Sequence, residues 1–327
     1  MQSLVLKKSN KGLGYFLAVV AALGWSTGGL ISHWLMTVPD ATTKHWAIPP
    51  LGCAITPTVL SGSRALSATL ILGLVLIIGA RKKLRLPQGV RSLVFLVPFG
   101  ALALAGMHFT YFKAISLSNV TTAILLEYLA PIFTLAFGVT VYKHKPTWQM
   151  LLGVCLAILG CAVVVGAFNE GGLLITPKAL IWGLAAAVFF AFYSIMGGAG
   201  SKRFSSFTLL FYGLLFAALM WLVVLGPKAV VAPFKNPAEA MAIIIMACVS
   251  TILPFGAYLI ALKYISPTHA SITAMLEPVT AAILSWALFG DKPTWSLAVG
   301  GAVVVFAIVL IQLSDANGEP NEFPLQD

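Results

Sequence analysis

The 327-residue sequence contains little charge. Asp, Glu, Lys and Arg together make up 9% of it, whereas 59% of the residues are hydrophobic. Soluble domains carry about 25% charged and about 45–50% apolar residues. Because so few charges cannot cover a surface that faces water, the composition excludes soluble enzymes and soluble binding proteins. It predicts a protein that lies in the lipid bilayer.

Cysteine is also scarce, and its four positions, Cys53, Cys155, Cys161 and Cys248, form no CxxC pair. Neither a disulfide framework nor a zinc site is expected from this pattern. The sequence lacks a P-loop, an HExxH motif and a histidine cluster, so no metal and no cofactor are expected. The net charge of +10 does not indicate a nucleic-acid partner, because basic residues of membrane proteins usually report topology.

What the sequence does contain is ten apolar segments that are long enough to cross a bilayer as helices. Each holds about 20 residues or more, and the alternation typical of a β-barrel is absent. The first segment continues too far for a cleaved signal peptide and is interpreted as a retained helix. We therefore expect an all-α membrane protein with ten transmembrane helices, at residues 12–36, 57–80, 92–112, 119–142, 147–168, 177–198, 206–226, 238–262, 268–289 and 294–313.

The basic residues are distributed unevenly between the two sides of this arrangement. Thirteen lie in loops on the side of the N-terminus and six on the opposite side, while Arg64 falls inside the second segment. Since Lys and Arg remain in the cytoplasm, both termini are predicted to be cytoplasmic. Residues 314–327 contain four acids and no Lys or Arg, which predicts a disordered cytoplasmic tail.

The motif KPTW occurs twice, at residues 145–148 and 292–295, and this repetition extends further. A shift of 147 residues aligns Pro131 with Pro278 and gives eleven identities over the 43 positions from Tyr111 to Gly153. The third to fifth segments are thus repeated as the eighth to tenth. Because each half holds five helices, an odd number, the second half should be inverted in the membrane. Inverted repeats are typical of secondary transporters, whose substrate site lies near the midplane.

Several motifs resemble the EamA family of the drug/metabolite transporter superfamily. They are GWSTGGL in the first segment, an arginine in the second, APIF after LLEYL, and LEPVTAAILSWALFGDKPTW. The resemblance covers residues 12–313 and implies two repeats, residues 1–168 and 169–313, followed by the tail 314–327. It implies a bacterial inner-membrane exporter or exchanger of small metabolites such as amino acids, without ATP hydrolysis. The usual Glu of the turn before KPTW is Asp291 in one copy and His144 in the other, a departure from the family pattern.

Two carboxylates, Glu127 and Glu277, are the only acids deep inside the segments. A charge at the centre of a membrane helix costs about 2.5–3.5 kcal/mol, which is usually tolerated for function or for a fixed partner. Glu277 should share one helical face with Thr273 and Thr280. Each carboxylate could bind substrate or exchange protons, because burial disfavours its charged form. Alternatively, Glu277 could satisfy backbone donors that Pro278 exposes.

Arg64 is the strong cation of the second segment. It could bind a substrate carboxylate, but a salt bridge or a snorkelling contact with the outer interface is the favoured interpretation. His108 should share a helical face with Tyr111 and Phe112. It is either a satisfied core histidine or part of a substrate pocket, and Tyr111 is a second candidate for that pocket.

Three further aromatic residues, Trp25, Tyr193 and Tyr258, are candidate substrate contacts, although helix packing alone would also explain each of them. His33 and His269 lie near segment ends and are expected at the membrane interface. Pro131 and Pro278 are assigned a structural role, in which each loosens a helix beside a cavity so that the halves can rock.

A second function class comes from GWSTG at residues 24–28, which satisfies the GxSxG pattern of hydrolases. The alternative to a transporter is therefore an intramembrane hydrolase or a lipid-modifying enzyme that uses Ser26 and a histidine. That mechanism needs a strand–turn–helix context, whereas Ser26 lies in a predicted membrane helix, and the same residues match the GxxxG packing motif. A receptor or scaffold is a more distant alternative. The leading hypothesis is a non-enzymatic transporter whose partners are a small-molecule substrate, the lipid bilayer and coupling protons.

Overall fold

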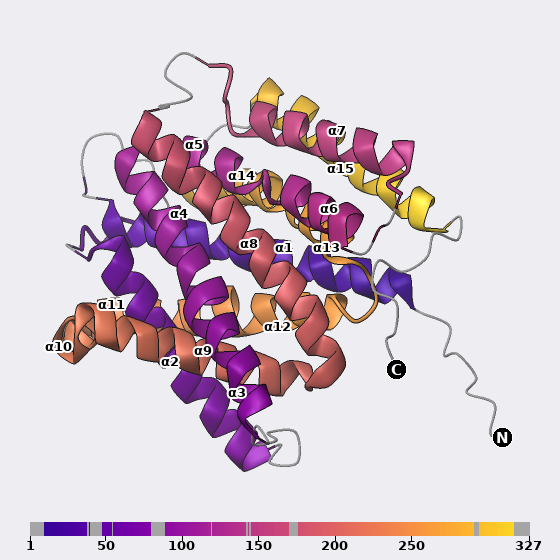
Figure 1. Cartoon of the computed structure of the whole chain (residues 1–327). Helices are drawn as coiled ribbons and strands as arrows, with labels where there is room; N and C mark the ends of the chain where they lie inside the picture. The colour runs from indigo at the N-terminus through magenta and orange to yellow at the C-terminus, as the bar shows by residue number, and fades with distance from the viewer. Residues whose placement is uncertain are drawn as a thin grey trace.

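The computed structural model describes residues 10–37, 39, 48–53, 55–79, 89–118, 120–141, 143, 145–169, 176–290 and 294–316. Within these ranges the chain is almost entirely helical and contains no strand. Nine spans of this part are long and apolar enough to cross a membrane, and the apolar helix Trp148–Val164 is a shorter tenth. The predicted all-α membrane fold with ten transmembrane helices is therefore confirmed (Figure 1). His144, Asp291 and residues 317–327 lie outside the described residues.

The first half contains two interrupted spans. Its third span includes a π-helical segment, and its fourth is broken between two short helices. In chain order the helices are α1 (Lys11–Met36), α2 (Pro57–Gly79), α3 (Val90–Val97), the π-helical segment Pro98–Leu104, α4 (Ala105–Leu117), α5 (Val120–Glu127), α6 (Ala130–Val141) and α7 (Trp148–Val164).

The second half repeats this pattern in its own third and fourth spans. It also has a short helix α10 where only a loop was expected, and α15 extends three residues into the predicted tail. The helices are α8 (Pro177–Arg203), α9 (Ser206–Leu225), α10 (Pro227–Val231), the 3₁₀ segment Ala232–Lys235, α11 (Pro237–Ala247), the π-helical segment Cys248–Ile252, α12 (Leu253–Ala261), α13 (Pro267–Ala274), α14 (Glu277–Phe289) and α15 (Trp295–Ala316).

The two helix breaks fall at equivalent positions. Helix α5 ends at Glu127 and α13 ends at Ala274, and these residues are 147 positions apart. Each break lies just before a proline, Pro131 or Pro278, which cannot donate a hydrogen bond to the carbonyl four residues earlier. That carbonyl belongs to the last residue of the preceding helix in both copies. The duplication inferred from sequence is thus also present in the backbone.

The pairing of the helices follows an approximate two-fold exchange of the two halves. Helix α4 packs against α8, and the corresponding pair in the exchanged halves, α12 and α1, is also in contact. Helices α2 and α9, which are equivalent elements, pack together, and α6 contacts α13, so the fourth spans of the two halves also meet. Helices α7 and α15 lie side by side along one edge of the bundle (Figure 1). This arrangement is expected of inverted repeats.

Two glycines make the contact between α7 and α15 close. A Cβ on Gly300 would lie 2.7 Å from the carbonyl oxygen of Gly160 and 2.7 Å from the amide nitrogen of Val164. A Cβ on Gly153, the residue equivalent to Gly300, would meet the side chain of Ile311. Since Ile311 is the equivalent of Val164, the contact is reciprocal. Small residues of this kind let membrane helices approach closely.

Candidate functional site

The two carboxylates inside the spans lie at the two helix breaks. Glu127 is the last residue of α5, and Glu277 is the first residue of α14. The hydroxyl of Tyr128 lies 2.6 Å from Oε2 of Glu277 and 3.1 Å from the carbonyl oxygen of Ala274, and donates to them. This contact joins the break of the first half to the break of the second. Glu277 was expected to accept from backbone donors beside Pro278. Its carboxylate instead accepts from the Tyr128 hydroxyl.

The expected polar face around Glu277 is also absent. The helix is interrupted at residues 275–276, so Thr273 and Thr280 do not continue one regular face. The hydroxyl of Thr273 donates to the carbonyl of His269, and that of Thr280 donates to the carbonyls of Leu276 and Glu277. Both hydroxyls are therefore bound to their own helices, as is common for threonine in membrane helices.

Arg64 points into the protein. Its side chain is 7% exposed, and its Nη2 atom lies 2.9 Å from Nε2 of His108. This geometry is incompatible with the snorkelling contact that was considered from sequence. Within the described residues, no carboxylate forms an ion pair with Arg64 at contact distance. The partner of Arg64 is the ring of His108, which also makes an edge-on contact with Phe255 at 5.6 Å between ring centroids.

Arg64, Tyr111, Glu127 and Glu277 interact electrostatically. The charge of Arg64 acts on Glu277 and Tyr111, and Glu127 interacts with Glu277 and Tyr111. Tyr111, Glu127 and Glu277 are half-buried. Together with His108, these residues form what we call the central polar cluster: Arg64, His108, Tyr111, Glu127 and Glu277. It collects groups of opposite charge from α2, α4, α5 and α14.

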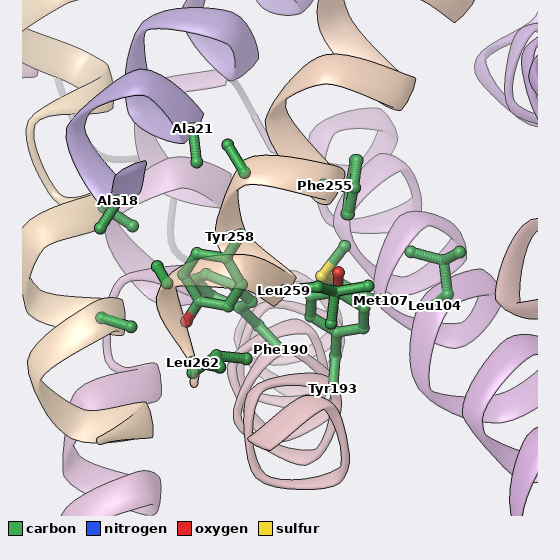
Figure 2. Packing of buried hydrophobic residues seen from close by; sticks show 14 of the residues in the cluster. Ala18, Ala21, Leu104, Met107, Phe190, Tyr193, Phe255, Tyr258, Leu259 and Leu262 are labelled. Carbon is green, nitrogen blue, oxygen red and sulfur yellow. The ribbon is translucent and has the colours of Figure 1, made fainter. Parts of the chain in front are cut away.

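A second group of side chains, the aromatic cluster, consists of Trp25, Phe190, Tyr193, Phe255 and Tyr258. Trp25 lies 5.1 Å from Tyr258 and 5.2 Å from Phe255 between ring centroids, and Tyr193 stacks on Tyr258 at 6.0 Å. Figure 2 shows Phe190 and Tyr193 on α8 directed toward Tyr258. The hydroxyl of Tyr258 lies 2.8 Å from that of Ser194. Within the described chain, Trp25 Nε1 and Tyr193 Oη have no hydrogen-bond partner.

The aromatic cluster adjoins the central polar cluster, because Phe255 contacts both His108 and Tyr193. The structure therefore brings all seven residues predicted to bind substrate, as well as Arg64, into one region. Sequence reasoning missed Tyr128, Phe190 and Phe255. The adjacency of Tyr128 to Glu127 was a signal for the first, whereas apolar rings in apolar helices gave no signal for the others.

His269, which was expected near the membrane interface, is the third residue of the span Pro267–Phe289 and is packed inside the protein. It is 4% exposed, its Nδ1 is hydrogen-bonded to Ser266, and its ring meets Tyr15 edge-on at 6.2 Å. Ser266 caps α13 by accepting from the backbone amide of His269, which draws the ring inward. The side chain of His33 lies outside the described residues.

Ser26 is packed in the interior of the protein. It is fully buried, and its hydroxyl donates to the carbonyl of Leu23 at 2.7 Å. A hydrolase nucleophile would instead donate to a general base. Among the described residues, no group of three or more His, Cys, Asp or Glu side chains could hold a metal ion.

A groove of about 590 Å³ lies on the surface between α14 and α15. Its wall is apolar, formed by residues such as Val279, Ile283, Val305 and Phe306, and contains no titratable side chain. A substrate site needs a few convergent polar groups. The central polar cluster provides them and this groove does not, so the cluster is the candidate site.

The comparisons with known proteins agree with this architecture. The model of the EamA-like transporter family matches residues 12–166 and again residues 177–313, one match for each half. A solved structure with a TM-score of 0.72 covers 94% of this chain and 99% of its own, at 21% sequence identity, which shows that the fold is shared.

Three curated relatives are similar over most of the chain or over a large part of it. An "Uncharacterized inner membrane transporter YicL" of Salmonella typhimurium is 22% identical over 92% of this chain and 95% of its own. A "Probable terminal-alkyne amino-acid exporter" of Streptantibioticus cattleyicolor is 26% identical over 58% of this chain and 63% of its own. An "S-adenosylmethionine uptake transporter" of Rickettsia prowazekii is 26% identical over 66% and 70%.

Proposed function

The chain belongs to the EamA-like transporter family, and from that premise we propose that it is a secondary transporter of small organic zwitterions, amino acids or related molecules, acting as an exporter or exchanger. The observation that carries this proposal is the central polar cluster, which places a guanidinium and two carboxylates between the two halves. A zwitterion has one group of each sign and is complementary to such a cluster. Two relatives support the substrate class, since their names specify an amino acid and S-adenosylmethionine, itself an α-amino acid.

Alternating access between the halves is the mechanism that we propose. Transporters with inverted repeats bind substrate near the midplane, beside discontinuous helices, and expose the site by rocking one repeat against the other. The breaks at residues 128–129 and 275–276 lie beside the cluster, and Tyr128 links one to the other through Glu277. A rocking motion would act on that contact.

Transport by the purified protein in proteoliposomes tests this function. Vesicles preloaded with an unlabelled amino acid should exchange it for the same labelled compound, across a panel of amino acids and S-adenosylmethionine. Empty vesicles without protein provide the background. Exchange at the background rate for the whole panel would contradict the proposed substrate class.

We further propose that the protein lies in the inner membrane with both termini in the cytoplasm, as the distribution of Lys and Arg favours. Single cysteines introduced at His144 and Asp291, in a background without the four native cysteines, should be labelled from opposite faces. Labelling of position 144 from the cytoplasm supports the orientation. Labelling of both positions from one face would contradict it.

Proton coupling through Glu127 completes the proposal. Glu127 ends α5, where the helix dipole presents partial negative charge, and a second carboxylate, Glu277, interacts with it. Glu277 instead begins α14, where the dipole favours an anion, and it also accepts from Tyr128. The two acids therefore have different surroundings, and Glu127 is the one suited to exchange a proton during transport.

A further inference from the structure

The contact between Arg64 and His108 fixes the state of both side chains. A guanidinium has donors and no acceptor, so Nε2 of His108 must accept the bond of 2.9 Å. The ring is consequently neutral and carries its proton on Nδ1. His108 thus orients the guanidinium without neutralising its charge.

The positive charge of Arg64 is left without an ion-pair partner at contact distance in the described structure. Arg64 and His108 are 7% and 8% exposed, so little of either side chain faces solvent. Glu277 acts on it electrostatically from a greater distance. A buried charge of this kind is expensive unless it is paired, which makes an anion a favourable addition.

Small residues lie near Nη1 of the guanidinium. A Cβ on Gly28, in the GWSTGGL motif of α1, would lie 3.9 Å from Nη1 of Arg64, and Ser250 packs beside the same glycine. Thr27 shares a hydrogen bond of 2.9 Å with the Ser250 hydroxyl. Hydroxyl groups and a glycine leave the Nη1 side less obstructed than large side chains would.

We propose that Arg64 is the receptor for the carboxylate of the transported molecule, and that His108 is a positioning residue that holds the guanidinium in the empty site. This inference rests on the proposed transport function and specifies the substrate class: molecules must carry a carboxylate or a comparable planar anion. The planar fork of arginine matches a carboxylate with two parallel hydrogen bonds. The ammonium group of the same molecule then faces Glu127 and Glu277, the anions of the cluster.

Discrimination between matched substrates tests the inference. The probes are L-methionine and S-adenosylmethionine, each compared with its decarboxylated amine in counterflow with reconstituted wild-type protein. The wild type should prefer the carboxylate-bearing probe at least tenfold. Arg64→Gln should abolish that preference, bringing the ratio of the two rates to about one, because a site built around a charged partner no longer rejects the amine once that partner is gone.

Two further variants separate recognition from folding. Arg64→Lys retains the charge but loses the fork, so it should keep a reduced preference for the carboxylate. His108→Leu should raise the KM for the carboxylate probe about tenfold with little change in the maximal rate, and His108→Gln, which retains an acceptor, should restore it. Arg203→Gln is the matched control, since Arg203 lies over the Phe95 ring, away from the site, and it should leave the preference unchanged.

The outcomes distinguish the transport function, the carboxylate receptor and the positioning role of His108. If the wild type transports neither member of either pair and exchanges no other amino acid of the panel above background, the proposed function fails and the inference fails with it. If the wild type transports both members equally, or if folded Arg64 variants lose both to the same extent, transport stands and the carboxylate receptor is contradicted. A KM for His108→Gln equal to that of His108→Leu would contradict the positioning role alone.

Discussion

The first half of the molecule supplies four of the five members of the central polar cluster, whereas the second half supplies only Glu277. The shift of 147 residues places His108 opposite Phe255, Tyr111 opposite Tyr258, and Glu127 opposite Ala274. The backbone is equivalent at these positions, with a break and a π-helical segment in each half. Duplication therefore supplied the scaffold twice, and the polar side chains are concentrated in one copy.

Because the halves are inverted, equivalent residues lie on opposite sides of the membrane midplane. The polar set of the first half therefore faces one side of the site, and its equivalents Phe255, Tyr258 and Ala274 face the other. A symmetric scaffold thus carries an asymmetric set of contacts. The following predictions test how far that asymmetry, rather than the shared backbone, determines transport and stability.

The largest effect is expected where the halves differ most. Glu127→Gln preserves shape but removes titration, so proton-driven accumulation should fall to the background, while substrate counterflow continues with a raised KM because Glu127 also faces the substrate ammonium. Glu277→Gln should instead lower the amount of folded protein or affect both activities alike. Accumulation and counterflow, measured for both variants from about pH 6 to pH 8, distinguish the two roles. If wild-type transport ignores the proton gradient, the coupling role of Glu127 is contradicted.

A second comparison concerns the equivalent glycines of α7 and α15. Gly300→Ala would place a Cβ against backbone atoms at 2.7 Å, which cannot move away easily. Gly153→Ala meets the side chain of Ile311, and the nearest backbone atom, the carbonyl oxygen of Ala307, lies at 3.5 Å. We expect a loss of stability of about 2–3 kcal/mol for Gly300→Ala and about 1 kcal/mol for Gly153→Ala. Thermal unfolding in detergent measures both, and equal losses would contradict the argument.

The link between the breaks has no symmetric counterpart, because the residue equivalent to Tyr128 is Met275. Tyr128→Phe removes the hydroxyl that donates to Glu277 and should destabilise the protein by about 1 kcal/mol, the range measured for such bonds in membranes. It should also change the transport rate. Met275→Leu, a volume-conserving change, is the control and should leave transport unaltered. A normal transport rate for Tyr128→Phe would mean that the contact is not part of the moving machinery.

The smallest effects concern two buried serines. Ser26 donates only to the backbone of its own helix, so Ser26→Ala should change stability by less than about 0.5 kcal/mol and leave transport intact. Ser194 also bonds Tyr258 in the aromatic cluster, and Ser194→Ala should cost about 1 kcal/mol. Unfolding midpoints and counterflow rates provide the comparison. A loss of several orders of magnitude for folded Ser26→Ala would support the hydrolase alternative.

The sequence alone determined that the protein lies in a lipid bilayer, that it has ten spans, and that its second half repeats the first. Apolar composition and segment length are local properties, and a bilayer leaves helices as the solution for such segments. Pro131 and Pro278 also predicted that two helices would be loosened. The breaks lie just before these prolines, because each proline leaves the backbone carbonyl four residues earlier without its donor.

Tertiary structure decided which polar side chains meet. Arg64 was expected in an ion pair or at the interface, yet it pairs with His108 from another span, 44 residues away. Tyr128 gained its role because the two breaks face each other, which brings it within reach of a carboxylate 149 residues later. Hydrogen bonds between spans depend on how helices cross and rotate, and one-dimensional spacing does not contain that information.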